Sequence, residues 1–232
     1  MSSRINPPES GWSKGSVVTM RIAVLLSGRG SNFASLLAAA DRGDLGANIA
    51  LVISNRPGAG GINIAREAGI DTALIDHQAY HTRAAFDRDL AGAIDHVNPD
   101  LVLLAGFMRI LTPEFVDRFS GRLMNIHPSL LPLYPGLHTH QRALDSGDCH
   151  GGATVHYVTS ELDGGPAIVQ AKVAIRADDS AETLASRVLE IEHKIYPAAV
   201  NWHVTGRLSF KAGILHKDGE PLPPSGHLWE AT

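Results

Sequence analysis

The stretch IAVLLSGRGSNFASLLAAA, residues 22–40, changes character twice along its length. Ile22–Leu26 is a continuous apolar run of the kind found in a buried β-strand. Phe33–Ala40 has the composition of a helix, and the polar turn Ser27–Asn32 joins the two segments. A strand that passes through a tight turn into a helix is the first half of a βαβ unit. This stretch therefore predicts an α/β fold that begins near residue 20.

The same alternation of strand and helix continues as far as residue 126. From the apolar patterns we expect strands at 49–54, 72–75, 101–104 and 122–126. We expect helices at 62–68, at 82–97 and from Pro113 to near Gly121. Because the connections between these units are short, they predict a right-handed, doubly wound and mostly parallel sheet.

The later part of the chain departs from this alternation. The expected strands 154–158 and 168–173 are separated by a loop that contains Asp163-Gly164-Gly165-Pro166, and no helical pattern lies between them. Strands joined without a crossover helix pair in antiparallel fashion. This segment therefore predicts an antiparallel extension of the parallel sheet.

A last helix is expected to begin near Ser180. Asp179 and Glu182 stand at the spacing of a capping box just before its apolar face. We find no repeats and no long linker, so residues 20–232 are expected to form one domain. Residues 1–19 are polar and lack the apolar core of a signal peptide, and we expect them to be a leader outside the fold.

Composition excludes several classes of protein. The chain has 232 residues, of which 44% are hydrophobic, and a formal net charge of −4, so no basic surface for nucleic acid is expected. No apolar run approaches the roughly 20 residues that a membrane span needs. A single cysteine, Cys149, cannot form an intramolecular disulfide. A reducing compartment such as the cytoplasm therefore fits better than secretion.

The turn Ser27–Asn32 is the first candidate binding site. It brings backbone N–H groups and a helix N-terminus together, which is an arrangement that binds anions. It is neither a Walker A loop nor a complete Gly-x-Gly-x-x-Gly, since Phe33 replaces the third glycine. A monophosphate therefore fits better than a dinucleotide. The alternative is a tight turn without a ligand.

The second candidate is Asn125-Ile-His-Pro-Ser129, at the carboxyl end of the expected fifth strand. Ligands bind at that edge of open α/β sheets. Strand alternation places Asn125 and His127 on the same side, where an amide donor and an imidazole could stabilise an oxyanion and move a proton. Asp163 would complete a proton relay if it lay beside His127. The alternatives are that His127 bonds the backbone and that Asp163 only shapes a turn.

Metal and covalent chemistry find little support in the sequence. The pair His138-Thr139-His140 has metal-ligand spacing, but no second ligand cluster accompanies it, so no metal is expected. Cys149 has no nucleophile motif around it, and no Gly-x-Ser-x-Gly is present.

Taken together, these segments resemble one known family. From about residue 20 to residue 224 the chain is similar to the glycinamide ribonucleotide formyltransferases. The resemblance rests on five motifs in order: 27–32 (SGRGSN), 104–111 (LAGFMRIL), 125–132 (NIHPSLLP), 134–140 (YPGLHTH) and 161–166 (ELDGGP). Any one of these motifs is weak, but five at the family's spacing are highly specific.

The resemblance implies an activity and its partners. A formyl group is expected to pass from 10-formyltetrahydrofolate to the amine of phosphoribosylglycinamide, in purine biosynthesis. It also implies a Rossmann-like formyltransferase fold and small-molecule substrates, with no metal, nucleic acid or membrane. A homodimer is compatible with it.

The resemblance also implies roles for individual residues. The catalytic trio is Asn125, His127 and Asp163. The nucleotide is bound by Gly30, Ser31, Asn32, Leu189, Glu190, Ile191 and Glu192. The formyl folate is bound by Arg83, Met108, Arg109, Ile110, Leu111, Asn125, Thr159, Ser160, Glu161, Leu162 and Asp163. This chain has Leu189 where some relatives carry Gln, and Arg29 where some carry Asn.

Three other functions are alternatives to this one. A methionyl-tRNA formyltransferase would share the trio but typically carries a further C-terminal domain and a basic surface. A formyltetrahydrofolate deformylase would give the formyl group to water and typically carries a regulatory domain before the catalytic one. A nucleotide-binding module without catalysis would keep the glycine-rich turn, but the presence of His127 and Asp163 argues against it.

Overall fold

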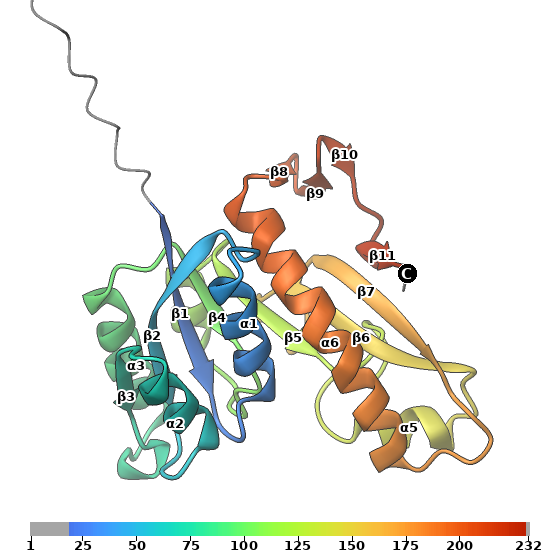
Figure 1. The fold of residues 1–232 in the computed structure, drawn as a ribbon, viewed down its shortest axis with the longest axis horizontal. Helices are drawn as coiled ribbons and strands as arrows, with labels where there is room; N and C mark the ends of the chain where they lie inside the picture. The colour runs from blue at the N-terminus through green and yellow to red at the C-terminus, as the bar shows by residue number, and fades with distance from the viewer. Residues whose placement is uncertain (1–18, 231–232) are drawn as a thin grey trace, which may run out of the picture.

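The computed structural model describes residues 19–230, and the predicted leader lies outside this range except for Thr19 (Figure 1). The strands of the main sheet are β1 (Met20–Leu26), β2 (Ala47–Ser54), β3 (Thr72–Leu74), β4 (Leu101–Leu104), β5 (Leu123–His127), β6 (His150–Tyr157), β7 (Ala167–Ala174) and β11 (His227–Trp229). The helices are α1 (Ser31–Asp41), α2 (Gly60–Glu67), α3 (Arg83–His96), α4 (Pro113–Arg118), α5 (Thr139–Asp145) and α6 (Ala181–Val204), with a 3₁₀ turn η1 (His77–Ala79).

The eight strands form one sheet in the order β11-β7-β6-β5-β4-β1-β2-β3. Strands β1 to β5 are parallel to one another, whereas β6 is antiparallel to both β5 and β7. The predicted doubly wound sheet and its antiparallel extension are thus confirmed. Parallel strands bring their carboxyl ends to one edge, so the turn after β1 and the end of β5 lie on the same side of the molecule.

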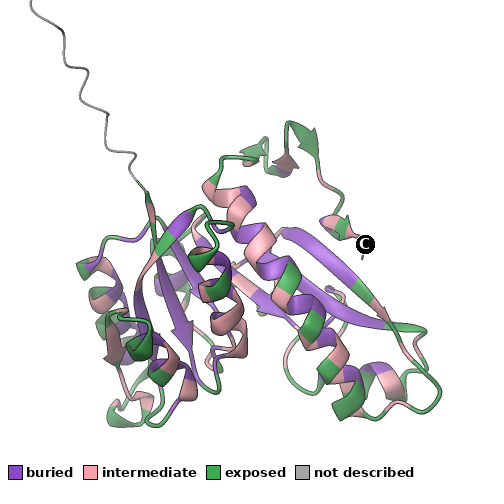
Figure 2. Ribbon diagram, in the orientation of Figure 1, coloured by how far each residue is buried: buried purple, intermediate pink, exposed green. Residues whose placement is uncertain are grey.

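Strand β1 shows why its sequence is apolar throughout. Ile22, Val24 and Leu26 belong to the hydrophobic cluster on one face of the sheet, and Ala23 and Leu25 belong to the cluster on the other. Helices α1, α2 and α6 contribute to the first cluster, and α3 and α4 contribute to the second. Figure 2 shows the central strands buried beneath helices whose outer faces are exposed. A strand covered on both faces has no position left for a polar residue.

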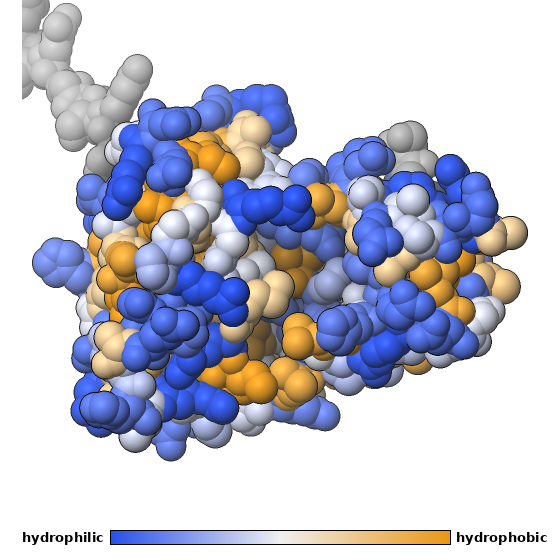
Figure 3. All heavy atoms as spheres, turned by 90° about the horizontal axis from the view of Figure 1, so that it is seen from below, coloured by the Kyte–Doolittle hydropathy of each residue, from blue (hydrophilic) through white to orange (hydrophobic). Residues whose placement is uncertain are grey.

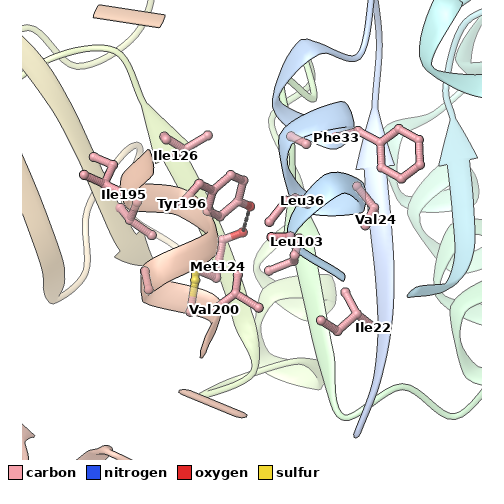
Figure 4. Packing of buried hydrophobic residues seen from close by; sticks show 14 of the residues in the cluster. Ile22, Val24, Phe33, Leu36, Leu103, Met124, Ile126, Ile195, Tyr196 and Val200 are labelled. Atoms are coloured by element: carbon pink, nitrogen blue, oxygen red, sulfur yellow. Dashed lines mark hydrogen bonds between the residues drawn. The ribbon is translucent and has the colours of Figure 1, made fainter. Parts of the chain in front are cut away.

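The long helix α6 is held against the sheet by a buried tyrosine. The hydroxyl of Tyr196 donates to the carbonyl oxygens of Leu104, at 3.1 Å, and Met124, at 3.2 Å, which belong to β4 and β5. Figure 4 shows the bond to Met124 within the packed cluster. Glu192 lies one helical turn before Tyr196 and is also buried. The tyrosine therefore fixes the part of α6 that reaches the functional edge.

Two of the helices differ from the expectations. Ser180 and Thr183 form the capping box of α6, whereas Asp179 and Glu182 were expected, because the helix begins one residue later. Helix α5 was not predicted.

The C-terminal strands were also not predicted. Strand β11 extends the main sheet beside β7, and a small antiparallel sheet contains β8 (Leu208–Lys211), β9 (Ile214–Lys217) and β10 (Glu220–Pro221). These strands are short and mostly exposed, so they lack the apolar pattern that reveals a strand. Within residues 19–230, no helix has the length and apolar character needed to cross a membrane.

Candidate active site

The end of β5 brings the predicted trio together. Asn125 and His127 lie two residues apart on β5, and Asp163 lies in the turn between β6 and β7. The Nδ1 atom of His127 is 3.4 Å from Oδ1 of Asp163, and both side chains are largely buried. This contact is the one that a proton relay between Asp163 and His127 requires, and the sequence alone could not establish it.

The side chain of His127 also contacts the backbone, as the alternative interpretation expected. Its Nε2 atom is 3.0 Å from the carbonyl oxygen of Tyr134, in the loop that follows β5. Both ring nitrogens thus face acceptors, and a doubly protonated imidazole satisfies both of them. Asp163 also accepts a hydrogen bond from the backbone N–H of Gly136 through Oδ2, at 2.7 Å. The loop, the imidazole and the carboxylate therefore hold one another in place.

The backbone at Asp163 is in the left-handed region, with φ of +49°. This conformation is uncommon outside glycine, although aspartate tolerates it better than most residues. Gly165 follows with φ of +100°, and a Cβ there would lie 2.2 Å from the carbonyl oxygen of Tyr157. The Asp-Gly-Gly sequence is thus what allows the turn to fold close to β6 and aim the carboxylate at His127.

Two further histidines lie near the trio and were not assigned roles from the sequence. Burial lowers the pKa of His140, and the proximity of His127 lowers it further. His156 lies opposite Asn125 in the β5–β6 pairing, and its Nε2 is 3.1 Å from Nδ2 of Asn125. Only the antiparallel register could have revealed this neighbour, since His156 is distant in sequence.

The predicted phosphate loop has the expected shape. Gly30 is the N-cap of α1 with φ of +83°, and a Cβ on it would lie 2.5 Å from Cα of Gly61 in helix α2. Only glycine allows this approach of two backbones. The helix begins at Ser31, so its free N–H groups face the carboxyl edge of the sheet, where an anion can bind.

Asn32 connects this loop to helix α6. Its Nδ2 donates to Oε2 of Glu192 at 2.7 Å, while its Oδ1 is buried and has no partner within residues 19–230. Glu192 is 6% exposed, and burial raises its pKa, although the bond from Asn32 acts in the opposite direction. The contact joins two predicted nucleotide-binding segments that are far apart in sequence.

The other predicted residues on α6 face different ways. Leu189 is half-buried, Glu190 is exposed, and Ile191 packs in the core beside the sheet. Of these four consecutive residues, Glu192 is the one that is hydrogen-bonded to the phosphate loop within residues 19–230. A helix turns by about 100° per residue, so these four side chains point in different directions.

The predicted folate segments form an exposed apolar border beside the trio. Met108 and Ile110 follow β4, and Leu162 precedes Asp163; each is more than half exposed. Leu133 and Leu137, in the loop after β5, are also exposed and were not predicted. Figure 3 shows the face toward which β1 points, with a hollow between two lobes and apolar residues around it. Exposed apolar groups around a hollow are typical of a ligand site.

The remaining predicted folate residues lie around the same segments. Arg83 is exposed at the first turn of α3. The guanidinium of Arg109 stacks over Phe86 at 4.7 Å from the ring centroid, and Leu111 packs against the second cluster. Thr159 is half-buried, and Ser160 and Glu161 are exposed in the turn before Asp163. The backbone of Met108 is fixed by donation to Oγ of Ser27 at 2.7 Å.

The raised pKa of Glu192 leads to a testable pH dependence. Between the pKa of an unfolded glutamate, about 4.3, and the raised folded value, the folded protein binds more protons than the unfolded chain. The carboxylate therefore destabilises the fold increasingly as pH rises through that window. We expect Glu192→Gln, which keeps an acceptor for Asn32, to be more stable relative to wild type at pH 7.5 than at pH 5.

Urea denaturation of both proteins at the two pH values measures this difference. Glu190→Gln, which removes an exposed carboxylate from the same helix, controls for the change in net charge. An identical stability difference at pH 5 and pH 7.5 would contradict the assignment.

The next features are the free cysteine and the side chains that could bind a metal ion. Cys149 is a free, exposed thiol. In the part of the chain that the structure describes, no group of three His, Cys, Asp or Glu side chains could hold a metal ion. The pair His138 and His140 therefore has no third ligand there. The groups that could move a proton at the end of β5 are His127 and Asp163.

Comparison with known proteins agrees with this geometry. The formyl transferase family model matches residues 20–200, so the chain belongs to the formyl transferase family. Within this family, the chain is 49% identical to the phosphoribosylglycinamide formyltransferase of Escherichia coli (strain K12) over 208 residues, which is 90% of this chain and 98% of the relative.

Two solved structures extend the comparison. The phosphoribosylglycinamide formyltransferase of Coxiella burnetii has a TM-score of 0.87 and 46% identity, covering 91% of this chain and all of that chain. A formyltetrahydrofolate deformylase from Pseudomonas putida KT2440 has a TM-score of 0.78 and 27% identity, covering 86% of this chain and 70% of the deformylase. The expected formyltransferase fold is therefore confirmed.

Proposed function

We infer that this chain transfers the formyl group of 10-formyltetrahydrofolate to the amine of phosphoribosylglycinamide, a step of purine biosynthesis. The observation that carries the proposal is the His127–Asp163 pair beside Asn125 at the end of β5. The contact between Asn32 and Glu192 supports a nucleotide site at the same edge of the sheet. This arrangement suits a phosphate-bearing acceptor whose amine reaches the trio.

The chemistry requires charge stabilisation and one proton transfer. The amine nitrogen forms a bond to the formyl carbon, the bond from that carbon to N10 breaks, and the proton lost by the amine ends on N10. We assign Asn125 and protonated His127 to stabilise the negative charge that develops on the formyl oxygen. We assign Asp163 to hold the imidazole and to pass the proton through water. Neither a metal ion nor a covalent enzyme intermediate is needed.

The apolar border supports the assignment of the formyl donor. Met108 and Ile110 after β4, and Leu162 beside Asp163, expose apolar surface that a flat aromatic ring system could cover. The backbone N–H and C=O groups of the same segments could bind the polar edge of a pterin. Arg83, exposed on α3, offers a cation for a carboxylate. When bound, the folate supplies the formyl group.

The deformylase activity is the competing function, because it needs the same donor and a similar trio. The nucleotide loop favours the transferase, since water as an acceptor has no phosphate to bind. Gly30 and the Asn32–Glu192 contact would then have no ligand to recognise.

A steady-state assay separates the two activities. Deformylation of 10-formyltetrahydrofolate is followed with and without phosphoribosylglycinamide. We expect deformylation to depend on the nucleotide and to fall by about 100- to 1000-fold in His127→Ala. Equal rates with and without the nucleotide would show a hydrolase instead.

A homodimer and a cytoplasmic location stay predictions. Light scattering behind a size-exclusion column distinguishes a monomer of 24.7 kDa from an assembly of twice that mass.

A further inference from the structure

A buried histidine contacts the amide of Asn125. His156 lies on β6 directly opposite Asn125 on β5, and it is 1% exposed. Its Nε2 is 3.1 Å from Nδ2 of Asn125. Neither the motifs of the sequence nor the roles described above include His156.

The other ring nitrogen determines the tautomer. Nδ1 of His156 lies 3.0 Å from the carbonyl oxygen of Tyr157 and 3.0 Å from that of Gly164. A carbonyl oxygen only accepts, so Nδ1 must carry the proton. Burial lowers the pKa of His156 and outweighs the carbonyl bonds and the nearby charge of Asp163, which act in the opposite direction. The neutral ring therefore presents Nε2 without a proton, as an acceptor.

This tautomer selects one orientation of the Asn125 amide. A bare Nε2 attracts the amide nitrogen, which donates, and repels the amide oxygen, which only accepts. A rotated amide would place two acceptors against each other inside the protein, which is costly. One N–H of Asn125 is thus occupied, and the position of its second N–H is fixed. The same ring bonds Gly164, the neighbour of Asp163.

We propose that His156 is a positioning residue, which holds the amide of Asn125 so that its second N–H donates to the formyl oxygen. This inference rests on the proposed function, in which Asn125 stabilises charge on that oxygen. A merely structural role is the alternative: His156 would only join β6 to the turn that carries Asp163. The two roles use different nitrogens, so they can be separated.

Two substitutions each remove one of the two contacts of His156, the contact with Asn125 or the contact with Gly164. His156→Asn places an amide nitrogen near the position of Nδ1, where it can donate to Gly164, but nothing reaches Asn125. His156→Gln places an amide oxygen near the position of Nε2, where it can accept from Asn125, but the donor to the turn is lost. His150→Asn changes an exposed histidine on the same strand and serves as the control.

We expect His156→Asn to lower kcat by about 10- to 100-fold, part of the cost of losing a donor to the oxyanion. The nucleotide KM should stay within about 3-fold, and His156→Gln should keep most of the wild-type kcat. In an Asn125→Ala background, His156→Asn should have no further effect on kcat, since the two residues act as one unit. A larger loss in His156→Gln than in His156→Asn, or additive losses in the cycle, would overturn the proposal.

A measurement on the wild-type protein does not depend on the folding of any variant. Long-range ¹H–¹⁵N spectra report which nitrogen of each histidine carries the proton, and comparison with His156→Gln assigns the signal. We expect His156 to be protonated on Nδ1 alone, and a proton on Nε2 would refute the proposal. Wild-type protein without formyl transfer would instead refute the proposed function, whatever the tautomer.

Discussion

Replacing Asp163 by Asn is expected to lower kcat by up to about 10,000-fold, by analogy with other aspartates that hold a catalytic imidazole. The carboxylate serves two partners, His127 through Oδ1 and the backbone N–H of Gly136 through Oδ2. An asparagine has only one acceptor oxygen, so its NH₂ group must face either the imidazole or another donor. The ion pair is lost in both orientations. The proposed nucleotide site is formed by other residues, so the KM for the nucleotide should change by less than about 3-fold.

Initial rates at saturating folate, with varied nucleotide, separate kcat from KM. Asp148→Asn is a matched control, because Asp148 accepts from the hydroxyl of Tyr134 in the same loop, and an asparagine oxygen can still accept there. Wild-type turnover in Asp163→Asn would remove this carboxylate from the mechanism. A large rise in nucleotide KM with unchanged kcat would place it in binding instead.

The second large effect is expected for Gly30→Ala. The added Cβ would lie 2.5 Å from Cα of Gly61, and the residue has φ of +83°. The two nearest atoms that this Cβ would meet, Cα and N of Gly61, are backbone atoms, so helices α1 and α2 must move apart or the loop must refold. A side chain in the left-handed region costs about 1–3 kcal/mol by itself, and the clash adds to this. We expect a loss of unfolding free energy of at least about 2 kcal/mol and a fall in kcat/KM for the nucleotide of about 100-fold.

Gly28→Ala is the control in the same loop, because no atom lies within 4 Å of its Cβ position. Urea denaturation and nucleotide titration should give near wild-type values for this variant. If Gly30→Ala bound the nucleotide as well as Gly28→Ala does, the close approach of the two helices would not be needed for binding.

The local sequence predicted the central elements well because each of them is buried in a simple way. Ile22–Leu26 and Leu101–Leu104 are covered on both faces, which requires continuous apolar runs. The predicted bounds of these elements agree with the structure to within a few residues. The C-terminal strands were not predicted, because β8–β10 are exposed and β11 pairs with β7 only through the folded sheet.

The sequence by itself determined the alternation of strands and helices, the glycine-rich turn and the residue types that carry the chemistry. These follow from burial periodicity and from backbone conformations that only certain residues adopt, and both are local properties. Only the tertiary structure decided which residues meet: Asp163 with His127, Glu192 with Asn32 and His156 with Asn125. These contacts depend on the order and register of strands and on the docking of α6, which are set by packing across the whole sheet. No local pattern along the chain encodes such distances.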